Sequence, residues 1–115
     1  MADVTIYHNP RCSKSRATLA LLEEREIDLQ IVEYLKTPPD TKTLKLLLEK
    51  LDIEPRALLR KGESVYKELG LSEVDDRDQL IEAMVKNPIL IERPIVVRGD
   101  KARIGRPPEK VLEIL

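Results

Sequence analysis

Cys12 is the sole cysteine of this 115-residue chain, and its thiol is the side chain best suited to act as a nucleophile. A thiolate is the nucleophilic form of cysteine, and it is favoured beside positive charge and at the start of a helix. The stretch around it, residues 4–22, contains no acid but has the only histidine and several bases, namely His8, Arg11, Lys14 and Arg16. Such a setting also attracts anions. The pattern therefore predicts an activated thiolate beside a place for an oxyanion.

Two neighbours of Cys12 extend this hypothesis. His8 is either an ordinary loop residue or a partner that stabilises the thiolate as an imidazolium. Ser15 stands three residues after Cys12, where a Cys-x-x-Cys motif would place its second thiol. Without that thiol, an oxidised Cys12 has to be resolved by an external one. Cys12 could instead be a small buried hydrophobic residue, but its polar and basic flanks argue against that.

Three arginines become candidates once an oxyanion is suspected: Arg60, Arg93 and Arg106. The planar guanidinium group donates paired hydrogen bonds that suit oxyanions. Each could equally be a solvated surface charge. We interpret the remaining arginines of helices and turns as surface charges, namely Arg16, Arg25, Arg56, Arg77, Arg98 and Arg103.

The elements that must position these residues follow from the hydrophobic pattern. Residues 4–7 and 29–32 are predicted strands, and residues 13–25 a helix between them, with Ala17, Ala20 and Leu21 at helical spacing. A leucine stripe at 44, 47, 48 and 51 predicts an amphipathic helix, and further helices follow up to residue 88. Residues 95–97 and 102–104 predict a hairpin, and Pro107 opens a last helix.

The sum is an α/β fold of the order β-α-β, helices, β-β-α, with a four-stranded mixed sheet flanked by helices. We expect one domain over residues 1–115, with a helical insertion at about 40–88.

A net charge of -1 and the absence of Trp and Phe argue against nucleic-acid binding. One cysteine and one histidine cannot build the usual zinc site, so no metal is expected. No apolar run is long enough for a membrane span, no signal peptide is evident, and we expect a cytoplasmic monomer.

The segment from His8 to Arg16 resembles the active-site loop of the glutaredoxin-coupled arsenate reductase family, which belongs to the thioredoxin-like superfamily. Residues 34–39, 56–60, 88–97 and 103–107 are similar to further segments of that family, in the same order. The resemblance covers nearly the whole chain. It implies a thioredoxin-like fold with a helical insertion.

The resemblance also implies an activity, arsenic detoxification by reduction of arsenate to arsenite. Cys12 would be the catalytic nucleophile, and the three arginines named above would bind arsenate. Supporting roles would fall to His8, Asn9, Ser15 and Pro94, with a cis bond between Arg93 and Pro94. Glutathione would be a co-substrate, glutaredoxin the protein partner, and no cofactor would be bound.

Two alternatives stay open. One is a related one-thiol oxidoreductase that acts on glutathione mixed disulfides, since a single thiol suffices for that chemistry. The other is a regulator without enzymatic activity that binds RNA polymerase. Such regulators usually carry a Cys-x-x-Cys switch, which Ser15 removes here.

Overall fold

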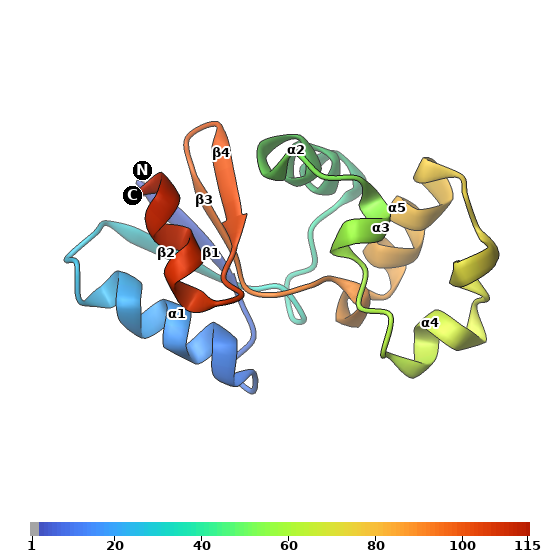
Figure 1. Ribbon diagram of the computed structural model, residues 1–115, viewed down its shortest axis with the longest axis horizontal. Coiled ribbons are helices and arrows are strands. Elements are labelled where there is room, and N and C mark those ends of the chain that lie inside the picture. The colour runs from blue at the N-terminus through green and yellow to red at the C-terminus, as the bar shows by residue number, and fades with distance from the viewer. Residues whose placement is uncertain (1–2) are drawn as a thin grey trace. The chain divides into compact units, whose positions relative to one another are not determined.

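The computed structural model describes residues 3–115 (Figure 1). Two strands from the N-terminal part of the chain and two from the C-terminal part form one mixed sheet of four strands. The strands are β1 (Val4–His8), β2 (Leu29–Glu33), β3 (Ile95–Arg98) and β4 (Lys101–Ile104), in the spatial order β2-β1-β3-β4. β1 and β2 are parallel, whereas β3 is antiparallel to both β1 and β4. The expected α/β fold with a mixed four-stranded sheet is therefore confirmed.

The helix α1 (Ser13–Glu23) connects the two parallel strands, as a βαβ unit requires. It packs beside the C-terminal helix η3 (Pro108–Ile114) (Figure 1). Their apolar sides and the strands β1 and β3 enclose one core, which consists of Val4, Ile6, Leu22, Val96, Val111 and Ile114. The hairpin between β3 and β4 has the predicted two-residue loop. Its first residue, Gly99, takes a φ of 61°, a conformation that glycine adopts readily.

The segment Pro38–Glu92 forms a second compact unit, and the first comprises the segments Met1–Thr37 and Arg93–Leu115. The second unit is helical, with α2 (Thr41–Leu51), α3 (Pro55–Leu58), α4 (Ser64–Glu68), η1 (Leu71–Glu73), α5 (Arg77–Lys86) and η2 (Pro88–Leu90). Asp40 starts α2 as its N-cap, and its carboxylate accepts the Thr43 N–H at 2.8 Å. The predicted leucine stripe is buried at Leu44, Leu47 and Leu48.

The predicted C-terminal helix is confirmed, and it is a 3-10 helix. Two local expectations were wrong. Ala17 and Ala20 of α1 are exposed, and besides the neighbouring Leu22 the helix buries Ser15 and Thr18. Arg56 is a structural residue, because its guanidinium donates to the Tyr66 hydroxyl at 2.9 Å and to backbone carbonyls of the same unit.

No helix within residues 3–115 is both long and apolar enough to cross a membrane.

Candidate active site

The loop between β1 and α1 places Cys12 at the start of the helix. Cys12 has extended backbone angles, φ -93° and ψ 123°, and is the N-cap residue of α1. Its N–H donates to the Asn9 carbonyl at 3.0 Å, and its own carbonyl accepts the Arg16 N–H at 2.9 Å. The Arg16 side chain also donates to the Pro10 carbonyl at 3.0 Å. Arg16 thus stabilises the loop between β1 and α1 through these two hydrogen bonds, and we had not predicted this role.

A buried polar cluster lies beneath the loop. The Nδ1 atom of His8 is 2.6 Å from the Ser15 Oγ atom, and that oxygen also accepts the Asn9 N–H at 3.0 Å. The Asn9 side-chain oxygen accepts the Arg11 N–H at 3.0 Å. Three side chains of this cluster, those of His8, Asn9 and Ser15, belong to buried residues. The structure therefore brings together the predicted supporting residues of the loop and gives each a hydrogen-bonding role.

The burial of His8 affects its protonation. Burial lowers the pKa of His8 from its ordinary value, with a smaller contribution from Arg16, although Glu33 and Glu23 oppose this shift. A neutral imidazole is therefore favoured near pH 7, and the hydrogen bond that the ring makes is to Ser15. The lowered pKa thus disfavours the imidazolium, one of the two roles left open for His8, and the structure shows the ring hydrogen-bonded to Ser15.

Arg106 reaches Cys12 from the far end of the chain. Its Nη2 atom donates to the Cys12 Sγ atom at 3.6 Å, and its Nε atom donates to the Arg93 backbone carbonyl at 2.8 Å. The second bond fixes the plane of the guanidinium group. Cys12 is only 8% exposed, whereas Arg106 is exposed to solvent. A cationic group that is itself open to solvent therefore contacts the sulfur, and it can also contact an incoming anion.

Pro94 and Gly105 hold Arg106 in this position. The bond between Arg93 and Pro94 is cis, as expected, and the bond between Arg106 and Pro107 is also cis. The Gly105 N–H donates to the Pro94 carbonyl at 2.9 Å. A Cβ atom on Gly105 would lie 2.5 Å from Thr18 Oγ1 and 2.8 Å from Pro94 Cγ. Gly105 is therefore a close-packing position next to the site, which sequence reasoning missed because no local pattern marks it.

Arg60 belongs to the helical unit Pro38–Glu92, and the contacts of its side chain lie within that unit. Its guanidinium forms ion pairs with Glu63 and, at 3.6 Å, with Glu92. Its N–H donates to the Leu90 carbonyl at 2.7 Å. These contacts show Arg60 paired with acids inside its own unit, and its role towards an oxyanion stays a prediction.

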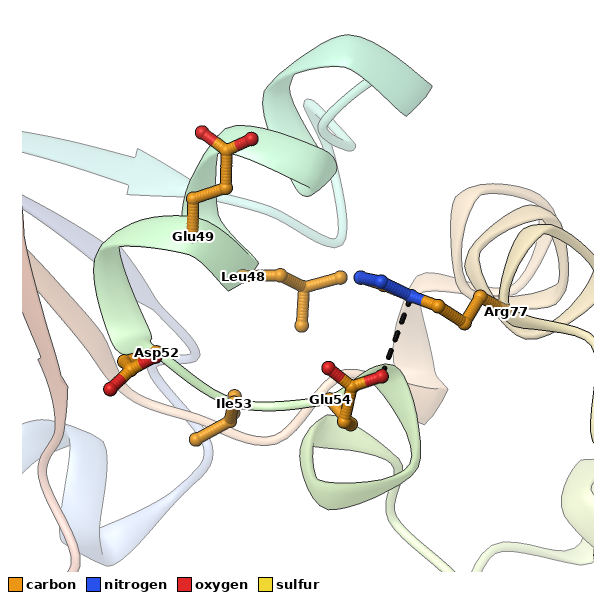
Figure 2. A pocket seen from close by; sticks show the side chains of 6 residues that line it. All are labelled: Leu48, Glu49, Asp52, Ile53, Glu54 and Arg77. Carbon is orange, nitrogen blue, oxygen red and sulfur yellow. Dashed lines mark ion pairs between the residues drawn. The ribbon is translucent and has the colours of Figure 1, made fainter.

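A hollow in the helical unit offers no comparable chemistry. It has a volume of about 280 Å³ and lies between the end of α2 and the start of α5. Figure 2 shows Arg77 reaching from α5 towards Glu54, with which it pairs at 3.5 Å, while Glu49 and Asp52 point away from the pair. The side chains of both partners are more than half exposed, so the ion pair contributes little stability. No cluster of metal-binding side chains occurs among residues 3–115.

Comparison with known proteins decides the family. The model of the ArsC family matches residues 7–114. The chain belongs to the ArsC family. An arsenate reductase from Neisseria meningitidis serogroup A is 48% identical over 117 residues, which cover all of both chains. The uncharacterised Escherichia coli protein YfgD is 56% identical over 114 residues, covering 97% of this chain and 96% of that protein.

A solved structure supports the same assignment. The arsenate reductase from Vibrio cholerae superposes with a TM-score of 0.95 at 53% identity, covering 99% of this chain and 98% of that one. The thioredoxin-like fold of the ArsC family is thus confirmed, as is the resemblance noted in the sequence.

Proposed function

We propose that this ArsC-family chain is an arsenate reductase that uses Cys12 as its nucleophile. The observation that carries the proposal is the contact between Arg106 Nη2 and Cys12 Sγ at 3.6 Å, at the first turn of α1. The N–H groups of a first helical turn have no partner inside the helix and favour an anion. A cationic side chain against the sulfur supports the same charge. Relatives named arsenate reductases supply the substrate class.

The first step is attack of the Cys12 thiolate on arsenic. A sulfur–arsenic bond forms, and one arsenate oxygen leaves as water after it has taken up protons. Arg106 and Arg93 are proposed to bind the remaining oxygens and to stabilise their charge during this loss. For Arg60, whose described side-chain contacts are its ion pairs with Glu63 and Glu92, binding of arsenate stays a prediction.

The second step needs electrons from outside the chain, because the sequence has a single cysteine. Glutathione displaces a second oxygen of the Cys12–arsenate adduct as water and forms its own sulfur–arsenic bond. A glutaredoxin thiolate then attacks the glutathione sulfur, so that a glutaredoxin–glutathione disulfide forms, this sulfur–arsenic bond breaks, and its electron pair stays on arsenic, which passes from As(V) to As(III). Water hydrolyses the remaining bond between Cys12 and arsenic, which releases arsenite and returns Cys12 to the thiol. Over the cycle two external thiols are oxidised to one disulfide. Ser15 fits this external route, since its hydroxyl is engaged with His8 and Asn9 where a second thiol would otherwise stand.

The test is a coupled assay in which NADPH, glutathione reductase, glutathione and glutaredoxin are mixed with the protein before arsenate is added. We expect arsenate to start NADPH consumption with the wild-type chain and not with Cys12→Ser. Arg106→Ala is expected to lose most of the activity, whereas Arg98→Ala, an exposed arginine at the end of β3, should retain it. Equal rates for the wild type and Cys12→Ser would refute the proposal.

The same variants separate this proposal from the glutathione mixed-disulfide alternative. An enzyme that removes glutathione from mixed disulfides needs Cys12 and does not need an oxyanion-binding arginine. Deglutathionylation that requires Cys12 and tolerates Arg106→Ala, combined with no response to arsenate, would favour that alternative.

A further inference from the structure

A small pocket lies at the carboxyl ends of the two parallel strands, β1 and β2. Its volume is about 220 Å³. One side is formed by residues 8–11, which lead directly into Cys12, and the other by Glu33, Leu35 and Lys36, which end and follow β2. The two sides adjoin because His8 and Glu33 are paired in the parallel register. Ligands of open α/β sheets commonly bind at the carboxyl ends of the strands.

The pocket presents charges of both signs. Arg11 and Lys36 supply two cationic groups, and Glu33 supplies an anionic one. Lys36 and Glu33 lie 3.6 Å apart, with side chains 79% and 42% exposed, so both can turn to a ligand. Leu35, which is 42% exposed, adds an apolar contact. A group carrying one carboxylate and one ammonium, as an α-amino acid does, matches this set.

The pocket also connects to the reactive loop through His8. His8 is 6% exposed and lines the pocket, and its Nδ1 atom is bonded to Ser15 in the first turn of the helix that Cys12 begins. An occupant of the pocket therefore contacts the ring that positions Ser15.

We propose that this pocket binds the α-amino-acid end of the external thiol, the γ-glutamyl head of glutathione, and so directs its thiol to Cys12. The inference rests on the proposed function, which requires an external thiol. A volume of 220 Å³ is below the range of about 300–1,000 Å³ that holds whole drug-sized ligands, so the pocket suits one end of the tripeptide.

The test measures thiol selectivity without arsenate. Cys12 is first converted to its mixed disulfide with thionitrobenzoate. An attacking thiolate then forms a disulfide with Cys12 and releases thionitrobenzoate, whose colour is followed by stopped flow. The thiols are glutathione, 3-mercaptopropionate, which has a carboxylate but no ammonium, and 2-mercaptoethanol, which has neither. Dividing each rate constant by that of 2-mercaptoethanol removes changes in the intrinsic reactivity of Cys12.

Loss of the cations should reduce the preference for glutathione. Lys36→Ala and Arg11→Ala are expected to lower the glutathione ratio by about threefold to tenfold, the range of ion pairs between exposed and partly buried groups. Lys101→Ala, which removes an exposed lysine of β4, is the matched control and should leave the ratio unchanged.

The variant Glu33→Gln distinguishes the proposed subsite from a general electrostatic effect, because the two predict opposite changes in the rate of attack by glutathione. Simple electrostatics predicts that removal of an acid speeds the attack of every anionic thiol. The proposed subsite predicts that Glu33→Gln slows glutathione, which loses a partner for its ammonium, while 3-mercaptopropionate becomes faster. Acceleration of both thiols, or ratios unaltered by Lys36→Ala and Arg11→Ala, would overturn the subsite.

A binding measurement completes the design. S-methylglutathione, which cannot react, is titrated into the reduced wild-type protein while the ring signals of His8, the sole histidine, are followed by NMR. We expect a saturable shift that weakens in Lys36→Ala, and no shift would count against the subsite. A preference for glutathione without arsenate turnover would refute the proposed function and leave the subsite standing. Arsenate turnover without that preference would refute the subsite and leave the proposed function standing.

Discussion

Gly105→Ala is the substitution whose effect the structure defines most closely. The added methyl carbon would lie 2.5 Å from Thr18 Oγ1, 2.8 Å from Pro94 Cγ and 3.2 Å from Thr18 Cγ2. Carbon atoms that pack well are about 3.5–4.0 Å apart, so the methyl group overlaps two neighbours. Thr18 cannot turn away without cost, because its hydroxyl donates to the Lys14 carbonyl at 2.8 Å.

Overpacking of this kind costs about 1–3 kcal/mol of unfolding free energy. For a chain of this size, each kcal/mol corresponds to a fall of about 4 °C in the unfolding temperature. We therefore expect Gly105→Ala to unfold about 4–12 °C below the wild type in a thermal melt followed by circular dichroism. Because Gly105 directly precedes Arg106, we also expect slower alkylation of Cys12 at neutral pH.

A double-mutant cycle identifies the cause. Thr18→Ala removes both Thr18 atoms that the new methyl group would meet, so the two substitutions together should cost less than the sum of their separate effects. A Gly105→Ala variant as stable as the wild type would refute the packing argument. Additive costs in the double variant would show that Thr18 is not the obstacle.

Three further predictions concern buried residues of the unit that contains the four-stranded sheet. Ser15→Ala removes the oxygen shared by His8 and the Asn9 N–H, and leaving that buried N–H without a partner should cost about 1–3 kcal/mol in urea unfolding; an unchanged midpoint would contradict this role. Because the pKa of His8 is lowered in the folded chain, the unfolded chain binds the proton more readily, and stability should be complete above the ordinary value of 6.5 and decline as the pH falls below it. His8→Asn should lose this component of the pH dependence, so an identical stability profile in the variant would be evidence against it. Leu22→Ala, at a fully buried core position, should cost about 2–5 kcal/mol, and a cost below 1 kcal/mol would mean that the core collapses around the cavity.

Much of the fold could be predicted because its signals are local. Short β-branched runs gave the strands, and the predicted stripe in α2 is buried at Leu44, Leu47 and Leu48. The Gly-Asp pair gave the hairpin loop. The position of Cys12 at the junction of a strand and a helix followed from the same patterns. Each of these depends on residues within one or two turns of each other.

The remaining features depend on residues distant in sequence or on buried polar groups. Arg106 is 94 positions from Cys12, so only the sheet brings them together, and no local pattern showed that this candidate arginine contacts the sulfur. Ser15 and Thr18 are buried in α1 because their hydroxyls are hydrogen-bonded. Hydrophobic periodicity cannot reveal such burial, and it selected Ala17 and Ala20 instead.

The order of the strands has a consequence for synthesis on the ribosome. β1 lies between β2 and β3, and its pairing of Thr5 with Val97 joins residues 92 positions apart. While the intervening helices emerge, one edge of β1 lacks its partner β3, and Val4 and Ile6 lack the core residues Val96, Val111 and Ile114. An unpaired strand edge invites association with other chains. The nascent chain is therefore most prone to aggregation in the interval that the helical segment occupies, before the final hairpin is made.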